Sequence, residues 1–405
     1  MFCGNCGREL EEGRKFCTFC GAEQKPGATG GMSTVKKVII GVVAALLVAG
    51  AGVGTYFIVR GSSSKETDST HSSKPRPPDV DDQSVKSEKL AYIDGRDIYT
   101  VGMTGSGQRK ITSRGDIVDF AVSPDGAWIA FVAEPGTRRV IFKMEPDGSN
   151  VSQVTVPEKG FADNPAFDPT GKYIYFTRVT PEDQANIEAA RPHGVGFERY
   201  EIAANRVDHL YTYGGLQEQS IQGLYADPAG GALYFNLFGS DWPSSIPHKL
   251  SLGPPARDSV YMPMQIDTGK YNAVAFQLTG FSRNGVYVSY FKQALFAEQD
   301  QNAGPTQEVS ACFRGTASGD ETAVATYVPA ETQQGSITGM EFSRVASSTY
   351  YYSKVATGPG ANSFTLDFYK GTTSGTPALT GLNVSVAVDN EQYTPLVWHL
   401  LAVQK

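Results

Sequence analysis

The amino-acid sequence predicts an all-β protein, a six-bladed β-propeller preceded by a small cysteine-rich domain and one transmembrane helix. Three observations predict this organisation. Four of the five cysteines lie in the first twenty residues, a long uncharged apolar run follows, and a strand-turn-strand phrase recurs through the rest of the chain. Gly and Pro make up about a sixth of the 405 residues with no triplet period, which excludes collagen and favours a turn-rich β protein.

The N-terminal cysteines form two pairs with the spacing of zinc ligands. Two residues separate the cysteines of each pair, ten residues separate the pairs, and a glycine follows the second cysteine of each pair. Two residues between paired thiolates let a tight turn aim both sulfurs at one point, and two such turns complete a tetrahedral zinc site. The sequence therefore predicts one structural zinc ion with four ligands: Cys3, Cys6, Cys17 and Cys20.

Residues 1–24, MFCGNCGRELEEGRKFCTFCGAEQ, resemble the short zinc ribbon found at the N-termini of many bacterial membrane proteins. The resemblance implies a closed, structural zinc site with no open coordination position for chemistry. Ribbons of that family often have Pro after the first cysteine of each pair, where this chain has Gly4 and Thr18. The difference leaves the four sulfurs in place.

A single membrane span is predicted at 38–59, a run of 22 residues without a charge. About 20 apolar residues cross a bilayer as a helix. A basic juxtamembrane segment, 25–37, precedes the span, and residues 1–37 carry six basic and four acidic side chains although the whole chain has a net charge of −7. By the positive-inside tendency, we expect a single-pass protein of the cell membrane with a cytoplasmic N-terminus and an extracytoplasmic propeller. A cleaved signal peptide fits less well, because the leader has no basic-then-apolar start.

Two further expectations concern the span and the segment after it. Residues 60–88 contain no aromatic and almost no apolar side chain, so we expect a disordered linker there. Within the span, Gly50 and Gly54 have the small-xxx-small spacing that lets two helices approach closely. A dimer through the transmembrane helix is therefore one possible assembly.

Residues 89–405 repeat a phrase in which an apolar strand meets a turn and continues into a second, alternating strand. Three clear copies and two weaker ones lie at 117–134, 164–178, 221–238, 272–291 and 337–354. Pro124-Asp125-Gly126 and Pro169-Thr170-Gly171 are expected at hairpin turns, where Pro and Gly suit the backbone angles. A period of roughly 45 to 60 residues with about four strands in each predicts a β-propeller.

The two ends of this region are expected to share one blade. Segment 89–112 reads as an outer pair of strands, and the last segment, 383–405, would supply the missing inner strands. Joining them closes a ring of six blades, although the degenerate last repeats leave five or seven open. Ser123-Pro124-Asp125-Gly126, followed by an Ile-x-Phe strand, resembles the repeat of the TolB-like six-bladed propeller family. That resemblance implies protein or ligand binding, and the motif itself is structural.

The sequence shows little recognisable catalytic chemistry. It lacks the G-x-S-x-G nucleophile elbow, and no two of its five histidines have metal-ligand spacing. The negative net charge argues against nucleic acid as a partner. His399 is expected to be a satisfied strand residue, and Cys312 a buried small hydrophobe.

One insert departs from the repeat and is the best candidate for a partner surface. Residues 181–201 are expected to add a short helix and a Gly-rich loop to the third blade, and loops on a rigid scaffold often carry function. Aromatic and Arg side chains suit protein interfaces. The candidate residues are Arg191, His193, Phe197, Glu198 and Arg199, together with Asp241-Trp242-Pro243 on another loop.

The expected function is therefore that of a single-pass membrane protein whose extracytoplasmic propeller binds a protein or cell-surface ligand. The alternative is a hydrolase or lyase that acts on an envelope polymer in the propeller channel. Carboxylates or histidines that converge at one channel mouth would favour the enzyme, whereas an apolar or aromatic rim would favour binding.

Overall fold

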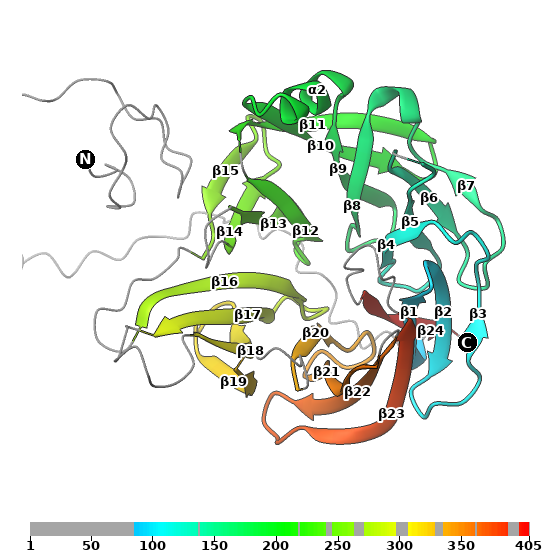
Figure 1. The fold of residues 1–405 in the computed structure, drawn as a ribbon, viewed down its shortest axis with the longest axis vertical. Helices are drawn as coiled ribbons and strands as arrows, with labels where there is room; N and C mark the ends of the chain where they lie inside the picture. Colours follow the sequence, from blue (N-terminus) through cyan, green and yellow to red (C-terminus); the bar gives the residue numbers. More distant parts are fainter. Residues whose placement is uncertain are drawn as a thin grey trace, which may run out of the picture. The chain divides into compact units, whose positions relative to one another are not determined.

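The computed structural model describes residues 85–404, except for 137, 218, 240–244, 263–270, 297–306, 329–334, 361–362 and 388–396. These residues belong to the second of two compact units, Arg76–Lys405. They form six four-stranded antiparallel sheets around a common centre, so the prediction of an all-β, six-bladed propeller is confirmed (Figure 1).

Each blade runs from an inner strand at the centre of the ring to an outer strand at its edge. The first blade contains β24 (Trp398–Gln404), β1 (Val85–Asp94), β2 (Asp97–Gly102) and β3 (Arg109–Lys110). The second contains β4 (Ile117–Val122), β5 (Ile129–Ala133), β6 (Val140–Met144) and β7 (Ser152–Gln153). The third contains β8 (Phe161–Phe167), β9 (Tyr173–Val179), β10 (His193–Glu201) and β11 (Arg206–Leu216).

The other three blades follow the same order. The fourth contains β12 (Ser220–Ala226), β13 (Ala232–Phe238), β14 (Ser245–Ser251) and β15 (Arg257–Val260). The fifth contains β16 (Tyr271–Phe281), β17 (Tyr287–Phe296), β18 (Gln307–Gly315) and β19 (Glu321–Tyr327). The sixth contains β20 (Ile337–Phe342), β21 (Thr349–Gly360), β22 (Ser363–Thr372) and β23 (Ala378–Ala387). Two short helices, η1 (Pro157–Lys159) and α2 (Pro181–Glu188), lie between strands.

The hydrophobic core is divided among the junctions between blades. Each of the six clusters of buried apolar side chains combines residues from two neighbouring blades. Strand β5 illustrates the consequence, because all five of its residues are buried between the blades on either side. Each inner strand also contacts the inner strands of both neighbours, so the ring is closed.

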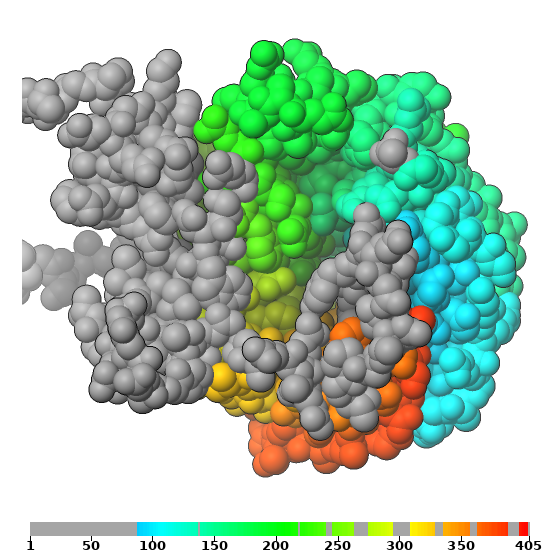
Figure 2. Space-filling model, in the orientation of Figure 1, coloured from blue at the N-terminus to red at the C-terminus, as the bar shows by residue number. Residues whose placement is uncertain are grey.

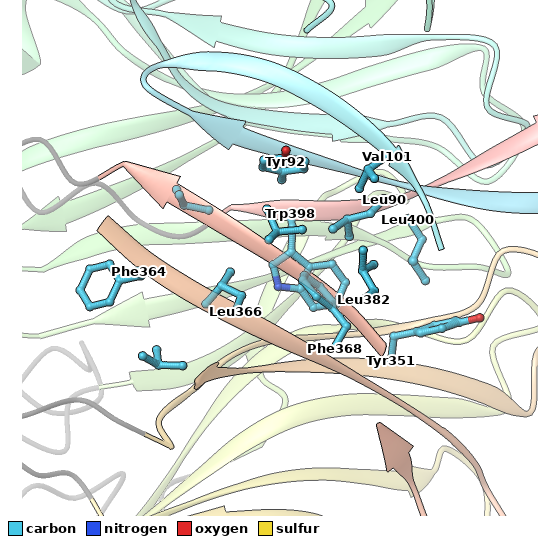
Figure 3. Close-up of a cluster of buried hydrophobic side chains, with 13 residues drawn as sticks. Leu90, Tyr92, Val101, Tyr351, Phe364, Leu366, Phe368, Leu382, Trp398 and Leu400 are labelled. Carbon is cyan, nitrogen blue, oxygen red and sulfur yellow. The ribbon is translucent and has the colours of Figure 1, made fainter. Parts of the chain in front are cut away.

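The ring closes between the sixth and first blades, through β24. Trp398 of β24 packs edge-on against Phe368 of β22, with ring centroids 5.2 Å apart (Figure 3). Its Nε1 donates a hydrogen bond of 2.7 Å to Ser353 Oγ. In Figure 2 the orange and red segments of the last blade lie against the cyan segment of the first. The expectation that the two chain ends share one blade is confirmed.

The division of strands within that blade differs from the prediction. The C-terminal segment supplies one inner strand, β24, and not two, while the N-terminal segment supplies three. Residues 383–387 belong instead to β23, the outer strand of the sixth blade. The first strand also begins at Val85, inside the expected linker 60–88, because residues from Val85 onward pair with β24.

The hairpin turns predicted at two of the repeats are confirmed. In the first, Ser123 Oγ donates to Asp125 Oδ1 at 2.6 Å, and the backbone N–H of Trp128 donates back to Ser123 Oγ at 2.9 Å. Gly126 has a φ of 71°, and a Cβ at this position would lie 2.0 Å from the carbonyl oxygen of Ala402. This glycine therefore permits both the turn and the close approach of β24.

The expected zinc ribbon, juxtamembrane segment and membrane span all lie outside the described residues. Among the helices of the described part, none is long and apolar enough to cross a bilayer.

Candidate functional site

A cavity of about 180 Å³ opens at the centre of the ring, where the inner strands turn into the second strands. Residues from the ends of β4, β8, β12, β16 and β20 line it, and His399 of β24 completes the circle. Every blade therefore contributes to this cavity. We refer to it as the channel mouth.

Two adjacent positions of each inner strand face opposite junctions. In β4 of the second blade, the last residue, Val122, packs towards the first blade. The penultimate residue, Ala121, packs towards the third blade. The same pattern places Phe167 and Ala166 on opposite sides of the third blade. The penultimate residues of the five inner strands β4 to β20 are Ala121, Ala166, Tyr225, Gly280 and Glu341. Of these five, only Glu341 carries a charge at neutral pH.

Glu341 forms an ion pair with His399 across the junction between the sixth and first blades. His399 Nδ1 contacts Glu341 Oε1, and the backbone N–H of Leu400 donates to Glu341 Oε2 at 2.9 Å. Burial alone would raise the pKa of Glu341, but His399 and then Arg344 hold it below its ordinary value. Burial would likewise lower the pKa of His399, but the Glu341 carboxylate raises it above its ordinary value. Each member of the pair therefore favours the charged form of the other.

This ion pair is one of several polar contacts that hold the ring closed. Glu88 of β1 accepts hydrogen bonds from Ser343 Oγ at 2.8 Å and from the backbone N–H of Arg344. The backbone N–H of Ala387 donates to Asp94 Oδ1 at 2.7 Å. The prediction that His399 is a satisfied strand residue is thus confirmed.

Asp119 on β4 also lies in the channel region. Its Oδ1 accepts a hydrogen bond of 2.9 Å from the backbone N–H of Phe120. Burial and the nearby carboxylate of Asp163 raise the pKa of Asp119 to about 7, against the opposing effect of His399 and Arg139. At neutral pH this carboxyl group is divided between its protonated and ionised forms.

The rim of the mouth is formed by equivalent residues of five turns. Each occupies the second position of the turn that follows an inner strand: Pro124, Pro169, Pro228, Arg283 and Arg344. Arg283 Nη1 donates a hydrogen bond of 3.0 Å to the carbonyl oxygen of Arg344, which ties the fifth blade to the sixth. One side of the rim is apolar and the other is cationic.

The channel mouth therefore has an apolar rim, which is the feature expected for binding. It also has a converging carboxylate and histidine, which are the features expected for catalysis. Glu341 and His399, however, are already engaged in closing the ring. Within the ranges that the structure describes, no three His, Cys, Asp or Glu side chains are grouped so that they could hold a metal ion.

The partner surface predicted at 181–201 is only partly what the structure shows. The expected short helix is α2, whose Thr180 N-cap Oγ accepts a hydrogen bond of 3.1 Å from the N–H of Asp183. The expected Gly-rich loop is instead part of β10, the third strand of the blade. Its alternating residues face neighbouring blades, so Phe197 is fully buried and cannot contact a partner.

Two further candidates in the insert have partners within the blade. Glu198 pairs with the buried Arg178 at 3.4 Å, and Arg199 pairs with Asp208 at 2.8 Å. The loop Asp241-Trp242-Pro243 lies outside the described residues. Cys312 is fully buried, as expected.

Sequence reasoning missed the four charged residues of the channel, Asp119, Arg283, Glu341 and Arg344. A signal for the two arginines was present, because alignment of the five turn phrases places them where the other three repeats have Pro. No comparable signal linked Glu341 to His399, since the two residues meet only when the ring closes. The zinc ligands Cys3, Cys6, Cys17 and Cys20 lie outside the described residues.

Comparison with known proteins gives one family match, at the N-terminus. Residues 2–24 match the family model of the zinc-ribbon domain, which includes all four predicted zinc ligands. No curated protein sequence matches the chain significantly.

The fold is similar to several solved propellers. TolB from Acinetobacter baumannii is 14% identical, with a TM-score of 0.49 over 78% of this chain and 66% of its own. An oligogalacturonate lyase in complex with manganese is 10% identical, with a TM-score of 0.44 over 70% of this chain and 69% of its own. A prolyl endopeptidase is 11% identical, with a TM-score of 0.42 over 76% of this chain and 51% of its own. Similarity at this level does not extend to ligands or activities.

Proposed function

We propose that the propeller is a ligand-binding domain whose site is the channel mouth, and that its ligand is a protein or another molecule of the cell surface. The observation that carries this proposal is the rim itself. Three prolines and two arginines from five different blades surround one open cavity, and a rigid closed ring fixes their positions. A concave, mostly apolar site with a few convergent polar groups is the usual form of a binding pocket.

We further propose that the chain is anchored in the cell membrane by residues 38–59, with the propeller outside the cytoplasm. The zinc ribbon would lie in the cytoplasm, where its zinc ion stabilises a segment too short to have a hydrophobic core. Ligand engagement by the propeller would localise or cluster the protein and so present the ribbon to a cytoplasmic partner. The charge asymmetry across the span supports this orientation.

An engineered cysteine in the linker tests the orientation. We expect Ser72→Cys to react with a membrane-impermeant maleimide on intact cells. Cys312 is fully buried and gives little background. If Ser72→Cys is labelled only after the cells are lysed, the proposed orientation is wrong.

Affinity capture from envelope extracts tests binding at the channel mouth. The bait is fragment 76–405, which contains the whole described ring and forms one compact unit. In a second bait, Pro169→Trp places a large side chain at an exposed rim position, and Lys172→Trp in the same turn is the control that does not line the cavity. We expect a partner that the original fragment and the control enrich and that Pro169→Trp loses. An identical set of captured proteins with all three baits would contradict binding at this mouth.

A hydrolase or lyase remains the second candidate, and one observation favours it. Asp119 has a pKa raised to about 7, mainly by burial, and this is a suitable value for a general acid or base. Purified fragment that cleaves envelope polysaccharide or peptide, with activity lost in Asp119→Asn, would establish the enzyme. The candidate ranks below binding because Glu341 and His399 already close the ring.

A further inference from the structure

A row of polar side chains crosses three strands of the third blade, away from the channel mouth. It consists of Arg178 of β9, Glu198 of β10, and His209 and Thr212 of the outer strand β11 (Figure 1). Arg178 Nε lies 3.4 Å from Glu198 Oε1, and His209 Nδ1 lies 3.5 Å from the same carboxylate oxygen. His209 Nε2 and Thr212 Oγ1 are 3.1 Å apart. None of these four residues lines the channel mouth.

A β-bulge in β11 brings His209 and Thr212 to one face of the blade. Residues three positions apart in a regular strand point to opposite faces. Here the register shifts, because Glu198 pairs with His209 whereas Gly196 pairs with Thr212, and Leu210 is the extra residue. Gly196 and Glu198 share a face of β10, so their partners share that face too. Bulges of this kind re-aim side chains and are common beside active sites.

The row runs from a buried end to an exposed end. The side chains of Arg178 and Glu198 are 6% and 13% exposed, whereas that of His209 is 54% exposed and Thr212 lies at the surface. A carboxylate only accepts hydrogen bonds, so Glu198 favours the tautomer of a neutral imidazole with its proton on Nδ1. The lone pair is then on Nε2, which faces the Thr212 hydroxyl. Such an arrangement is that of a nucleophile, a base and an orienting carboxylate.

Space for a substrate lies beside this hydroxyl. Gly214 and Gly215 follow Thr212, and a Cβ at either position would meet no atom of the described residues within 4 Å. A Cβ at Gly194 of β10 would lie 3.1 Å from Thr212 Cγ2, so the glycine there gives the threonine side chain its room. The hydroxyl is therefore open to a substrate that approaches from outside the blade.

We propose that this row is an esterase site, with Thr212 as the nucleophile, His209 as the general base and Glu198 as a positioning residue. The substrate is a carboxylic ester of a short acyl group. Arg178 holds the Glu198 carboxylate from the buried side. The site lies outside the channel mouth, and its activity does not depend on the proposed function.

The reaction takes two steps. Thr212 Oγ1 attacks the carbonyl carbon of the ester, and its proton moves to His209 Nε2. The bond from that carbon to the leaving alcohol then breaks, and the proton passes from His209 to the alcohol oxygen. In the second step, water gives a proton to His209 and attacks the acyl-threonine, and that proton restores the Thr212 hydroxyl. An ester suits this site better than an amide, because an alkoxide leaves more readily than an amide nitrogen.

An alkyl fluorophosphonate tests the nucleophile without any need for turnover. A bond forms between Thr212 Oγ1 and phosphorus, the P–F bond breaks with loss of fluoride, and the hydroxyl proton goes to His209. With fragment 76–405 we expect one adduct, which peptide mass spectrometry locates on Thr212. Thr212→Ala should abolish the adduct, and His209→Ala should slow its formation by about 100-fold, as loss of a general base does. Thr322→Ala, at an exposed position of the outer strand β19, is the matched control and should react like the original fragment.

Hydrolysis of p-nitrophenyl acetate tests the other members of the row. Thr212→Ser should keep the activity, because serine retains the hydroxyl with less crowding around it. Glu198→Gln should lower kcat by at least about tenfold and leave KM unchanged, because the carboxylate orients His209 in the transition state. If Glu198 only stabilised the blade, this substitution would lower the unfolding temperature and leave kcat of the folded protein unchanged.

Other results would overturn the proposal. An adduct that Thr212→Ala retains would place the nucleophile elsewhere. Hydrolysis that Thr212→Ala keeps and His209→Ala loses would show an exposed histidine that acts alone. A fragment that neither forms the adduct nor hydrolyses the ester would show that the row only stabilises the blade. None of these results bears on binding at the channel mouth, which Pro169→Trp tests.

Discussion

Replacement of Asp119 by Asn should stabilise the propeller at neutral and alkaline pH and leave it unchanged in acid. The pKa of Asp119 is raised to about 7, from an ordinary 3.8, chiefly by burial and then by Asp163. Because the folded-state pKa lies above the unfolded value, stability from this group is greatest below about pH 4 and falls as the pH rises to about 7. At 1.36 kcal/mol per pKa unit, ionisation of Asp119 costs the fold at most about 4 kcal/mol at pH 8.

The variant removes that cost without removing the contact. The side-chain oxygen of Asn can still accept the backbone N–H of Phe120, as Asp119 Oδ1 does at 2.9 Å, but an amide does not ionise. Because the side chain of Asp119 is only partly buried, we expect a gain of about 2 to 4 kcal/mol at pH 8.

Urea unfolding of fragment 76–405 and its Asp119→Asn variant, at pH 4, 6 and 8, measures this difference. The two unfolding free energies should agree at pH 4 and separate progressively towards pH 8. His399 and Arg139, which face Asp119 and oppose the raised pKa, are present in both proteins and cancel in the comparison. A difference that is absent at pH 8, or that is the same at all three pH values, would refute the reasoning.

Three further predictions concern the closure of the ring, one of its turns and the ribbon. A double-mutant cycle on Glu341→Gln and His399→Ala should give a coupling of about 2 to 4 kcal/mol. Because the pKa of Glu341 is lowered and that of His399 raised, this coupling should be largest between about pH 4.5 and 6.5 and fall on both sides, and a flat profile would contradict it. In thermal unfolding, Gly126→Ala should destabilise the fragment by at least about 3 kcal/mol, since its Cβ would meet the Ala402 carbonyl. The control Gly136→Ala should cost about 1 kcal/mol, because Gly136 has a similar φ of 70° but open space around it. Elemental analysis should find one zinc ion per full-length chain. The Cys3→Ser/Cys17→Ser variant should lose this zinc, while the unfolding of its propeller stays unchanged. Zinc that is retained by the variant would exclude these cysteines as ligands.

Much of the fold could be predicted from local patterns. The phrases at 117–134, 164–178 and 221–238 form the first two strands of their blades, β4 with β5, β8 with β9, and β12 with β13. These pairs could be predicted because alternation and turn residues act within a few positions of each other. The arrangement of the first blade was harder to predict. Strand β24 pairs with β1 across almost the whole propeller sequence, and the alternation within either strand does not reveal that pairing.

The candidate site could be predicted less well, for the same reason. Glu341 and His399 lie 58 residues apart and meet only because the last strand returns to the first blade. Residues 193–201 read as a Gly-rich loop because of their two glycines, yet cross-strand pairing with β9 makes them a strand that buries Phe197. Tertiary pairing overrides local propensity at such positions.

A photo-crosslinking amino acid at the rim, in living cells, tests binding at the channel mouth most directly. The full-length chain would carry the crosslinker at position 169, where the exposed Pro169 lines the mouth, or at the control position 172 in the same turn. We predict a discrete crosslinked product from position 169 that position 172 does not give, and that Arg344→Gln weakens. The same products from both positions, or none from position 169, would contradict a ligand at the channel mouth.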